Sequence, residues 1–535
     1  MGGSRSEPEA LLGRRGLLLA GAAGLLAGCS STSPSGHASS PAGSASGTPS
    51  PAQPSSRRAP RPPRPGDWDR LARHVTGPLR RPGDRGYDRV RLVQNPRYDD
   101  NHPLAVLTVA DPGDVATALS FARDHDVPVS LRSGGHSYPG WSAGGAAGTG
   151  VPPSLVIDCR ALHGVRLHGD GTARIGAGAA LAPVYAAVGG RGRAIAGGSC
   201  ATVGIGGLTL GGGVGVLTRA MGLTCDAVRS LQVVTADSRV RRVDAHHDPD
   251  LFWALRGGGG GHLGVVTSFD LQTAAAPTVH TFYLSWPLAD ARAVVRAWQG
   301  WAPAADHRLW STCKLLGGQK HPQGPTILVD GTWTGPAAGL DRRLAGLLDH
   351  CPPPDVRSVH THSYRDQMLA YAGCSAIPVS RCHTGPGGSL QREAFAATSH
   401  VGYRELGSAG LTRLLDHVEH AQSTRLREAG ISMDALGGRV RDLAPGETAF
   451  VHRHALMTVQ YTATYAGDLG KQATHYVRAF RDAMVPSWGD HAYVNYADAA
   501  VRNYRRAYFG ANAPRLGRVR RQYDPHGLFT QPQDF

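Results

Sequence analysis

The stretch "SGGHSYPGWSAGG", residues 133–145, determines how the rest of the sequence is interpreted. It places one histidine, His136, and two aromatic residues, Tyr138 and Trp141, among small residues. Glycine costs backbone entropy on folding, so a glycine-rich turn indicates that something approaches the backbone closely. Two more glycine clusters follow, at 197–215 and 257–264. Backbone N–H groups exposed in such loops bind anions, phosphates above all, and three loops predict a long ligand with a pyrophosphate in its middle.

The third cluster does not fit a dinucleotide-binding Rossmann turn. Gly259, Gly261 and Gly264 satisfy the spacing GxGxxG. That motif must follow a strand and open a helix. Here it follows a predicted helix over 248–258 and opens a predicted strand over 264–273, so the order is reversed and the Rossmann interpretation is rejected.

Short strands and helices alternate through the first half of the chain. A strand over 105–111, a helix over 114–126 and a strand over 127–133 lead into the first glycine loop. This alternation predicts an α+β domain over residues 67–275. A second α+β domain is predicted over 276–490, with helices over 341–350 and 411–430 and a strand over 455–465, and residues 491–535 form a final segment.

The N-terminus has the layout of an export signal. "GRRGLLLAGAAGLLAGC", residues 13–29, pairs two arginines with an apolar stretch that is too short to span a bilayer as a helix. The arginine pair resembles a twin-arginine signal, and "LLAGC" resembles a lipobox, which predicts a lipid anchor at Cys29. A signal that is simply cleaved is the alternative. Residues 30–66 are rich in Ser, Pro, Ala and Gly and predict a flexible linker, so the protein is expected outside the cell membrane, anchored or secreted.

Charge and cysteine content narrow the function classes. The net charge of +15 does not predict nucleic-acid binding, because the basic residues are mostly scattered arginines and no run interleaves them with aromatic residues. Export permits disulfides, and Cys374 and Cys382 bracket a short loop and could pair. The sequences "HTH" (360–362) and "HRH" (452–454) have no acidic partner nearby, so no metal site is predicted.

Several long motifs, in the same order, resemble the berberine bridge enzyme family of FAD-linked oxidases. They are "LRSGGHSYPGWS", "GGSCATVGIGGLTLGGGVGVLTRAMGLTCDAV", "DLFWALRGGGGGHLGVVTSFDL", "FVHRHALMTVQY" and "AYVNYADAAV" with the C-terminal "DPHGLF". The resemblance covers roughly residues 98–535 and implies a two-domain α+β fold of the PCMH type (the vanillyl-alcohol-oxidase type). In that fold, N- and C-terminal segments form the FAD-binding domain and the substrate-binding domain is inserted between them.

The resemblance implies FAD held by two covalent bonds, from His136 to the flavin 8α-methyl group and from Cys200 to flavin C6. A neutral imidazole and a thiolate are both competent nucleophiles for such bonds. Further cofactor contacts are expected from Arg132, Ser133, Gly134, Gly135, Ser137, Gly198, Val203, Gly204, Gly207, Gly222, Asp226, Gly264, Val265, Val266 and Asn495. The chain departs from the family at His262-Leu263, where Asn-Phe is usual, and at Val401, where a tyrosine is usual in many relatives.

The catalytic base is expected to be Tyr493. "AYVNYAD" would place Tyr493 and Asn495 on one face of an extended segment and Tyr496 on the other. A core tyrosine packed between the domains is the alternative. Tyr403 and Gln460 are the next candidates for the pocket.

The predicted function is FAD-dependent oxidation of an alcohol-type substrate, such as a sugar, an oligosaccharide or a glycosylated natural product. Electrons would pass from a substrate carbon to FAD, with O2 as the acceptor that yields H2O2. A flavin dehydrogenase with another acceptor and a non-catalytic surface lipoprotein that keeps the flavin fold are the alternatives.

Overall fold

A computed structural model describes residues 61–145 and 149–535. The predicted export signal with Cys29, and the predicted linker as far as residue 60, lie outside the described residues. Helix α1 (Pro65–His74) begins inside the end of that predicted linker, two residues before residue 67, where the predicted first domain starts. Its start is fixed by Asp67, which accepts a hydrogen bond from the Arg64 N–H at 2.9 Å and pairs with Arg61 at 2.8 Å.

The first part of the chain builds two sheets. The four-stranded sheet has the order β1 (Leu79–Arg80), β2 (Ala105–Thr108), β4 (Leu155–Asp158), β3 (Val129–Arg132), and β4 runs parallel to both β2 and β3. The five-stranded antiparallel sheet has the order β5 (Val165–Leu167), β6 (Thr172–Gly176), β10 (Val265–Gln272), β8 (Val228–Val234), β9 (Val240–Asp244). A short ladder joins β7 (Arg193–Ala194) to β11 (Ala274–Ala275).

Helices of this part pack beside the sheets and between the glycine loops. They are α2 (Tyr87–Val90), α3 (Pro112–His125), α4 (Leu181–Gly189), α5 (Ile205–Leu210), α6 (Thr218–Met221) and α7 (Pro249–Ala254). Helix α3 begins where the Asp111 carboxylate accepts hydrogen bonds from the Gly113 and Asp114 N–H groups. The third glycine cluster follows α7 and precedes β10, so the reversed order that excluded a Rossmann turn is confirmed.

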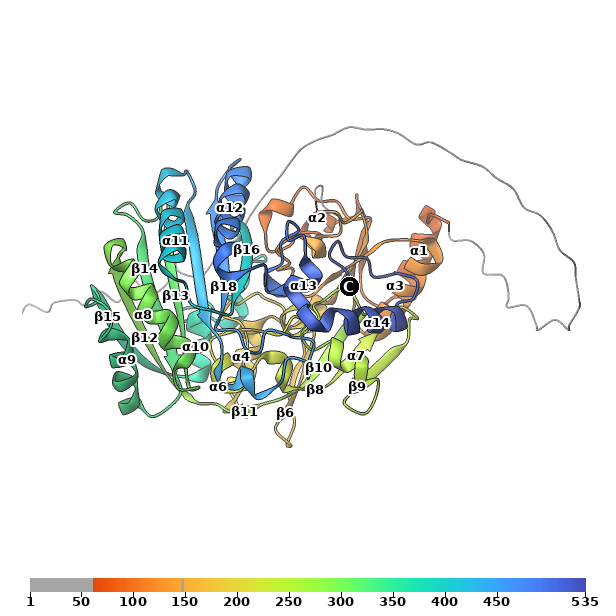
Figure 1. Ribbon diagram of the computed structural model, residues 1–535. Coiled ribbons are helices and arrows are strands. Elements are labelled where there is room, and N and C mark those ends of the chain that lie inside the picture. Colours follow the sequence, from red (N-terminus) through yellow and green to blue (C-terminus); the bar gives the residue numbers. More distant parts are fainter. Residues whose placement is uncertain (1–60, 146–148) are drawn as a thin grey trace, which may run out of the picture.

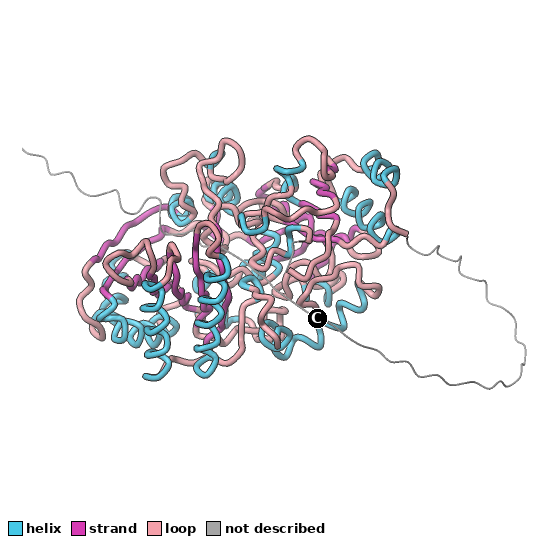
Figure 2. The backbone as a smooth tube through the Cα atoms, turned by 90° about the horizontal axis from the view of Figure 1, so that it is seen from above, coloured by secondary structure: helices cyan, strands magenta, loops and turns pink. Residues whose placement is uncertain are grey.

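The second part is one seven-stranded antiparallel sheet with helices on one side (Figures 1 and 2). The strand order is β15 (Val356–Ser363), β12 (Thr278–Pro287), β14 (Thr326–Trp333), β13 (Leu309–Gly317), β17 (Glu428–Ala435), β18 (Met457–Tyr465), β16 (Ala394–Gly402). The helices on that side are α8 (Ala291–Ala304), α9 (Leu340–Leu348), α11 (Ser408–His420) and α12 (Gly470–Trp488), whereas α10 (Tyr364–Tyr371) packs into the core of the first part. Apolar side chains of α8, α9, α11 and α12 share a core with the sheet.

The helix predicted over 411–430 is wrong in its second half. Helix α11 ends at His420, a 3-10 turn covers Ala421–Ser423, and β17 begins at Glu428. The Thr424 hydroxyl donates to the carbonyl of Ala421 at 2.7 Å and closes this turn. The residues that follow are buried by pairing with β13 and β18, so tertiary contacts override the local helical pattern.

The C-terminal segment returns to the first part of the chain. Helices α13 (Tyr504–Phe509) and α14 (Ala513–Tyr523) bury Phe509, Leu516 and Val519 in the same core as α7 (Figure 1). Between α12 and α13 the chain forms a 3-10 turn, Val494–Tyr496. The extended segment expected there is therefore wrong, and Tyr493, Asn495 and Tyr496 are not arranged by strand alternation.

Buried arginines fasten the two parts to each other. Arg219, on α6, is fully buried and donates to carbonyl oxygens of the second part, including Leu309 at 2.7 Å and Pro303 at 3.0 Å. Arginine satisfies several carbonyls at once because its donors are fixed in a plane. Across residues 61–145 and 149–535, no helix is long and apolar enough to cross a membrane.

Candidate active site

A cavity of about 410 Å³ lies where the glycine loops of the first part face the sheet of the second. Its walls come from the loop after β3, the loop before α5, the loop before β10, the 3-10 turn Val494–Tyr496, and strands β13, β14, β17, β18 and β16. The cavity volume is within the usual range for a pocket that binds a ligand or cofactor.

Glycines form the first wall because two backbone segments cross there without room for side chains. A Cβ atom on Gly134 would lie 2.2 Å from the Gly204 nitrogen, and one on Gly204 would lie 2.0 Å from the Ser133 Oγ. The Ser133 hydroxyl donates to the carbonyl of Ala177 at 2.6 Å and fixes the loop. Backbone therefore lines this side of the cavity, as the glycine pattern predicted.

Most of the predicted site residues line this cavity. They are Arg132, Ser133, Gly134, Gly135, His136, Ser137, Gly198, Cys200, Val203, Gly204, Gly207, Gly264, Val265, Val266, Gln460, Tyr493 and Asn495. Three predicted residues, Gly222, Asp226 and Tyr403, are not among the lining residues.

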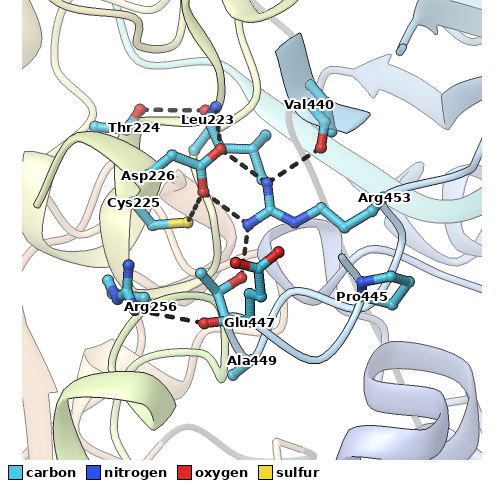
Figure 3. Close-up of polar contacts among 12 residues, drawn as sticks. Leu223, Thr224, Cys225, Asp226, Arg256, Val440, Pro445, Glu447, Ala449 and Arg453 are labelled. Carbon is cyan, nitrogen blue, oxygen red and sulfur yellow. Dashed lines mark hydrogen bonds and ion pairs between the residues drawn. The ribbon is translucent and has the colours of Figure 1, made fainter. Parts of the chain in front are cut away.

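Asp226 lies at a domain contact instead of the cavity (Figure 3). Its carboxylate accepts hydrogen bonds from the buried guanidinium of Arg453 at 2.7 and 2.8 Å and from the Leu223 N–H at 2.9 Å. Gly222 ends α6 with φ 82°, a conformation that suits glycine, and a Cβ there would lie 3.1 Å from the Asp226 carboxylate. Both residues shape the turn that Arg453 holds, which explains their place in the family motif.

His136 and Cys200 both line the cavity. A hydrogen bond of 2.9 Å joins the His136 Nε2 to the Thr202 hydroxyl. Burial lowers the pKa of His136 to about 4, so the imidazole is neutral near pH 7. Cys200 is unpaired, and burial raises the pKa of its thiol.

The tyrosines of the site differ in what their hydroxyl groups do. The Tyr493 hydroxyl accepts hydrogen bonds from the N–H groups of Gly213 (3.0 Å) and Val214 (3.3 Å) and from the Asn495 amide (2.9 Å). Burial raises the pKa of Tyr493 to about 12. Tyr493 therefore ties the C-terminal segment to the second glycine loop.

Tyr496 and Tyr138 form a second, more accessible pair. Their rings stack with centroids 5.5 Å apart, and the Gln460 amide donates to the Tyr138 hydroxyl. The Tyr496 hydroxyl has no hydrogen-bond partner within the described residues. Burial raises its pKa well above the ordinary tyrosine value, and the charge of Asp434 adds to that rise.

Tyr403 lies beyond the end of β16, 38% exposed, and its hydroxyl is hydrogen-bonded to the His452 Nδ1 at 2.8 Å. That position is outside the cavity wall. Val401, where a tyrosine was expected from the family, is fully buried beside Tyr493 in a small apolar cluster.

A row of polar side chains on the sheet forms the second wall, and the sequence reasoning found only Gln460 of it. Thr312 of β13 is paired with Asp330 on β14 and with Asp434 on β17. Two residues further along β13, Lys314 is paired with Ser432 on β17. The Lys314 ammonium pairs with the Asp330 carboxylate at 2.8 Å. The signal was a lysine in the otherwise uncharged strand "LWSTCKLLG", but its neighbours across the sheet depend on register.

The cavity contains polar atoms that suit a bound cofactor. The indole N–H groups of Trp141 and Trp310 and the Ser142 hydroxyl are buried without a hydrogen-bond partner within the described residues, and all three residues line the cavity. Buried donors are normally satisfied. At the departure from the family motif, the His262 Nδ1 lies 3.3 Å from the Asp534 carboxylate, and the ring packs on Phe535, while the backbone of the loop remains in the wall.

Comparison with known proteins agrees with this arrangement. Residues 103–244 match the family described as "FAD binding domain", and residues 492–534 match "Berberine and berberine like". The chain is 31% identical over 466 residues to the uncharacterized FAD-linked oxidoreductase YgaK of Bacillus subtilis, covering 86% of this chain and 96% of that protein. The chain belongs to the berberine bridge enzyme-like family of FAD-linked oxidoreductases.

Other relatives support the same placement. The chitooligosaccharide oxidase of Gibberella zeae is 29% identical, with 81% of this chain and 87% of that protein covered. The solved structure of Physcomitrella patens BBE-like 1 superposes with a TM-score of 0.78 at 26% identity, covering 88% of this chain and 98% of the other. The PCMH-type α+β fold is thereby confirmed, and the chain is an FAD-linked oxidoreductase.

Two of the cysteine and histidine expectations can also be compared with the structure. Cys374 and Cys382 form a disulfide, which confirms that pairing. In the part of the chain that the structure describes, no three His, Cys, Asp or Glu side chains are grouped as metal ligands.

Proposed function

We propose that this chain is an exported oxidase that oxidises a hydroxyl group of an oligosaccharide or a related glycoside. One observation carries the proposal: the cavity joins a backbone cradle for FAD to a row of carboxylate, amide and hydroxyl side chains. Such side chains suit the many hydroxyl groups of a sugar, and Trp310, Tyr371 and Phe395 offer apolar walls. Relatives named as oxidases of chito-, xylo- and glucooligosaccharides, 28–30% identical, support this class.

FAD, when bound, supplies the two-electron acceptor. The chain must then position the substrate hydroxyl. The geometry favours Tyr496 over Tyr493 for this task, because the Tyr493 hydroxyl is already surrounded by three N–H donors, whereas the Tyr496 hydroxyl is free to meet a ligand. Gln460, which orients Tyr138, and Asp434 complete the polar surroundings of Tyr496.

The test is anaerobic mixing of the FAD-loaded protein with neutral oligosaccharides, followed by loss of the flavin's visible absorbance. Reduction by at least one such sugar is expected, and Tyr403→Phe, which lies outside the cavity, should keep the wild-type rate. A protein that binds these sugars but whose flavin stays oxidised would instead support the non-catalytic lipoprotein.

The covalent links are part of the proposal. His136 and Cys200 line the same cavity, so either single alanine variant should retain FAD through the other bond. The double variant His136→Ala/Cys200→Ala should release FAD on acid precipitation. Mass spectrometry of the denatured wild-type chain measures this directly, and complete release of flavin from the wild type would exclude both bonds.

Oxygen as the acceptor is the remaining choice, with a dehydrogenase as the second candidate. Gly198 bears on it because a Cβ there would lie 3.5 Å from Leu181 and Leu208 side-chain carbons, an ordinary contact. The variant Gly198→Ala should therefore fold, and its flavin should be reduced at the normal rate. The added methyl group would take up space in the cavity two residues before Cys200. We expect reoxidation by O2 to slow about 10-fold or more in stopped flow, whereas slow reoxidation of the wild type would identify a dehydrogenase.

Export and the lipid anchor rest on the N-terminal sequence and on the disulfide, which is typical of oxidising compartments. Cys29→Ser should release the protein from the membrane fraction or stop its processing. The double variant Arg14→Lys/Arg15→Lys should block twin-arginine export. A wild-type protein found free in the medium with an unmodified N-terminus downstream of Cys29 would exclude the anchor.

A further inference from the structure

A line of aromatic rings begins in the cavity wall. Tyr138 stacks on Tyr496 with centroids 5.5 Å apart, and Tyr496 meets Tyr493 edge to face at 5.0 Å. Tyr138, Tyr496 and Tyr493 all line the cavity. These three tyrosines are therefore among the oxidisable side chains that a one-electron oxidant formed in the cavity can reach.

The same line continues to the protein surface. The ring of Phe450 lies 6.0 Å from that of Tyr493 and 5.7 Å from that of His452. The ring of His452 lies 6.0 Å from that of Tyr403, which is 38% exposed. Electron tunnelling falls steeply with distance, so rings in successive contact form a favourable path. Phe450 is too hard to oxidise to hold a charge itself, and acts only as a bridge between Tyr493 and the outer pair.

The outer pair is built for loss of an electron together with a proton. The Tyr403 hydroxyl and the His452 Nδ1 are 2.8 Å apart. Burial lowers the pKa of His452 to about 3, and burial raises the pKa of Tyr403 to about 12, so near pH 7 the phenol donates and the imidazole accepts. A tyrosine that has lost an electron is a very strong acid, and even a weakly basic imidazole takes its proton.

We propose that Tyr403 is a redox-active tyrosine, the surface outlet for single oxidising equivalents that arise in the FAD cavity. A one-electron oxidant in the cavity, such as light-excited flavin, is reduced by one electron from Tyr496 or Tyr138, and an electron from Tyr403 replaces the lost one through the intervening rings. The O–H bond of Tyr403 breaks, its proton moves to the His452 Nδ1, and a neutral phenoxyl radical remains. An external thiol or phenol returns the electron, and the proton moves back from His452. The outlet protects the cavity from oxidative damage.

Blue light tests this path, because light-excited flavin is itself a strong one-electron oxidant. The FAD-loaded protein is illuminated in air with a nitroso spin trap, and the labelled residue is located by peptide mass spectrometry. We expect the trap on Tyr403. In Phe450→Leu, which removes the bridging ring, the label on Tyr403 should fall at least 10-fold while label or oxidation on Tyr493, Tyr496 or Tyr138 rises.

A control separates the relay from simple exposure. When the oxidant is generated in bulk solvent by a soluble photosensitiser, Tyr403 should be labelled equally in the wild type and in Phe450→Leu. If Phe450→Leu folds poorly, Phe450→Met removes the same ring with an unbranched side chain and should give the same loss. Equal labelling of Tyr403 in the wild type and both variants under flavin illumination, or no label on Tyr403 in the wild type, would overturn the proposal.

Discussion

The wall of the cavity that belongs to the FAD-binding domain is made of backbone, whereas the facing wall is made of side chains standing on a seven-stranded sheet. In the first wall, Gly134 and Gly204 let two segments cross at distances that exclude a Cβ atom. In the second, Lys314, Asp330, Asp434, Ser432 and Gln460 reach the cavity from four strands. The first wall therefore depends on close backbone packing, and the second depends on the polar groups of its side chains. Substitutions in the first wall should impair FAD binding, whereas substitutions in the second should impair the binding and reaction of the substrate.

The most complete loss of function is expected in the backbone wall, because a chain that does not hold FAD cannot turn over. In Gly134→Ala the new methyl group would lie 2.2 Å from the Gly204 nitrogen and 2.6 Å from the Thr202 carbonyl oxygen, so backbone must move. We expect FAD content, measured as the ratio of flavin to protein absorbance, to fall more than 10-fold. Gly407→Ala is the matched control, because a Cβ there meets nothing within 4 Å and the residue lies outside the cavity. Normal FAD content in Gly134→Ala would show that the cradle is more plastic than its geometry indicates.

That contrast also explains what the sequence could and could not predict. The backbone wall was predictable because glycine clusters around His136 and Cys200 are local signals, and nearly all the residues predicted from them line the cavity. Gly222 and Asp226 belong to the same motif but hold a domain contact through Arg453. A sequence motif groups residues that contact the ligand with residues that hold the surrounding fold. Only the three-dimensional structure separates the two kinds.

The side-chain wall was mostly missed for a physical reason. Asp330, Thr312 and Asp434 are far apart in sequence and meet only through strand register, which a single sequence does not define. The same limit affected Tyr493 and Tyr496, because strand alternation was assumed where the chain forms a 3-10 turn. The helix predicted to continue past His420 was wrong for a related reason, since pairing with β13 and β18 decides that segment.

A second prediction separates the two walls at the tyrosines that join them. Tyr496→Phe should slow anaerobic flavin reduction about 100-fold or more, because the substrate hydroxyl loses the group that positions it, with little change in stability. Tyr493→Phe leaves the N–H groups of Gly213 and Val214 without their acceptor, and should lower the free energy of unfolding by about 1–3 kcal/mol. Rapid mixing and chemical denaturation measure the two effects. The opposite pattern, slow reduction only in Tyr493→Phe, would restore Tyr493 as the base.

The smallest effect is expected at the Lys314–Asp330 pair. It tests whether charged side chains of the second wall contribute to substrate binding without affecting FAD binding. The ammonium and carboxylate are 2.8 Å apart, both partly accessible from the cavity, and lie on the same sheet face as Ser432 and Gln460. Lys314→Met keeps the length of the side chain but removes the charge, so Asp330 is left without its partner. We expect KM for the best oligosaccharide to rise about 10-fold, equivalent to about 1.4 kcal/mol of binding, with FAD content unchanged and kcat within a few-fold. The double variant Lys314→Met/Asp330→Leu removes both charges, so it leaves no unpaired carboxylate and should be more stable than the single variant without recovering KM. Recovery of KM as well would mean that the pair only neutralises itself and that the sugar is held elsewhere on the sheet.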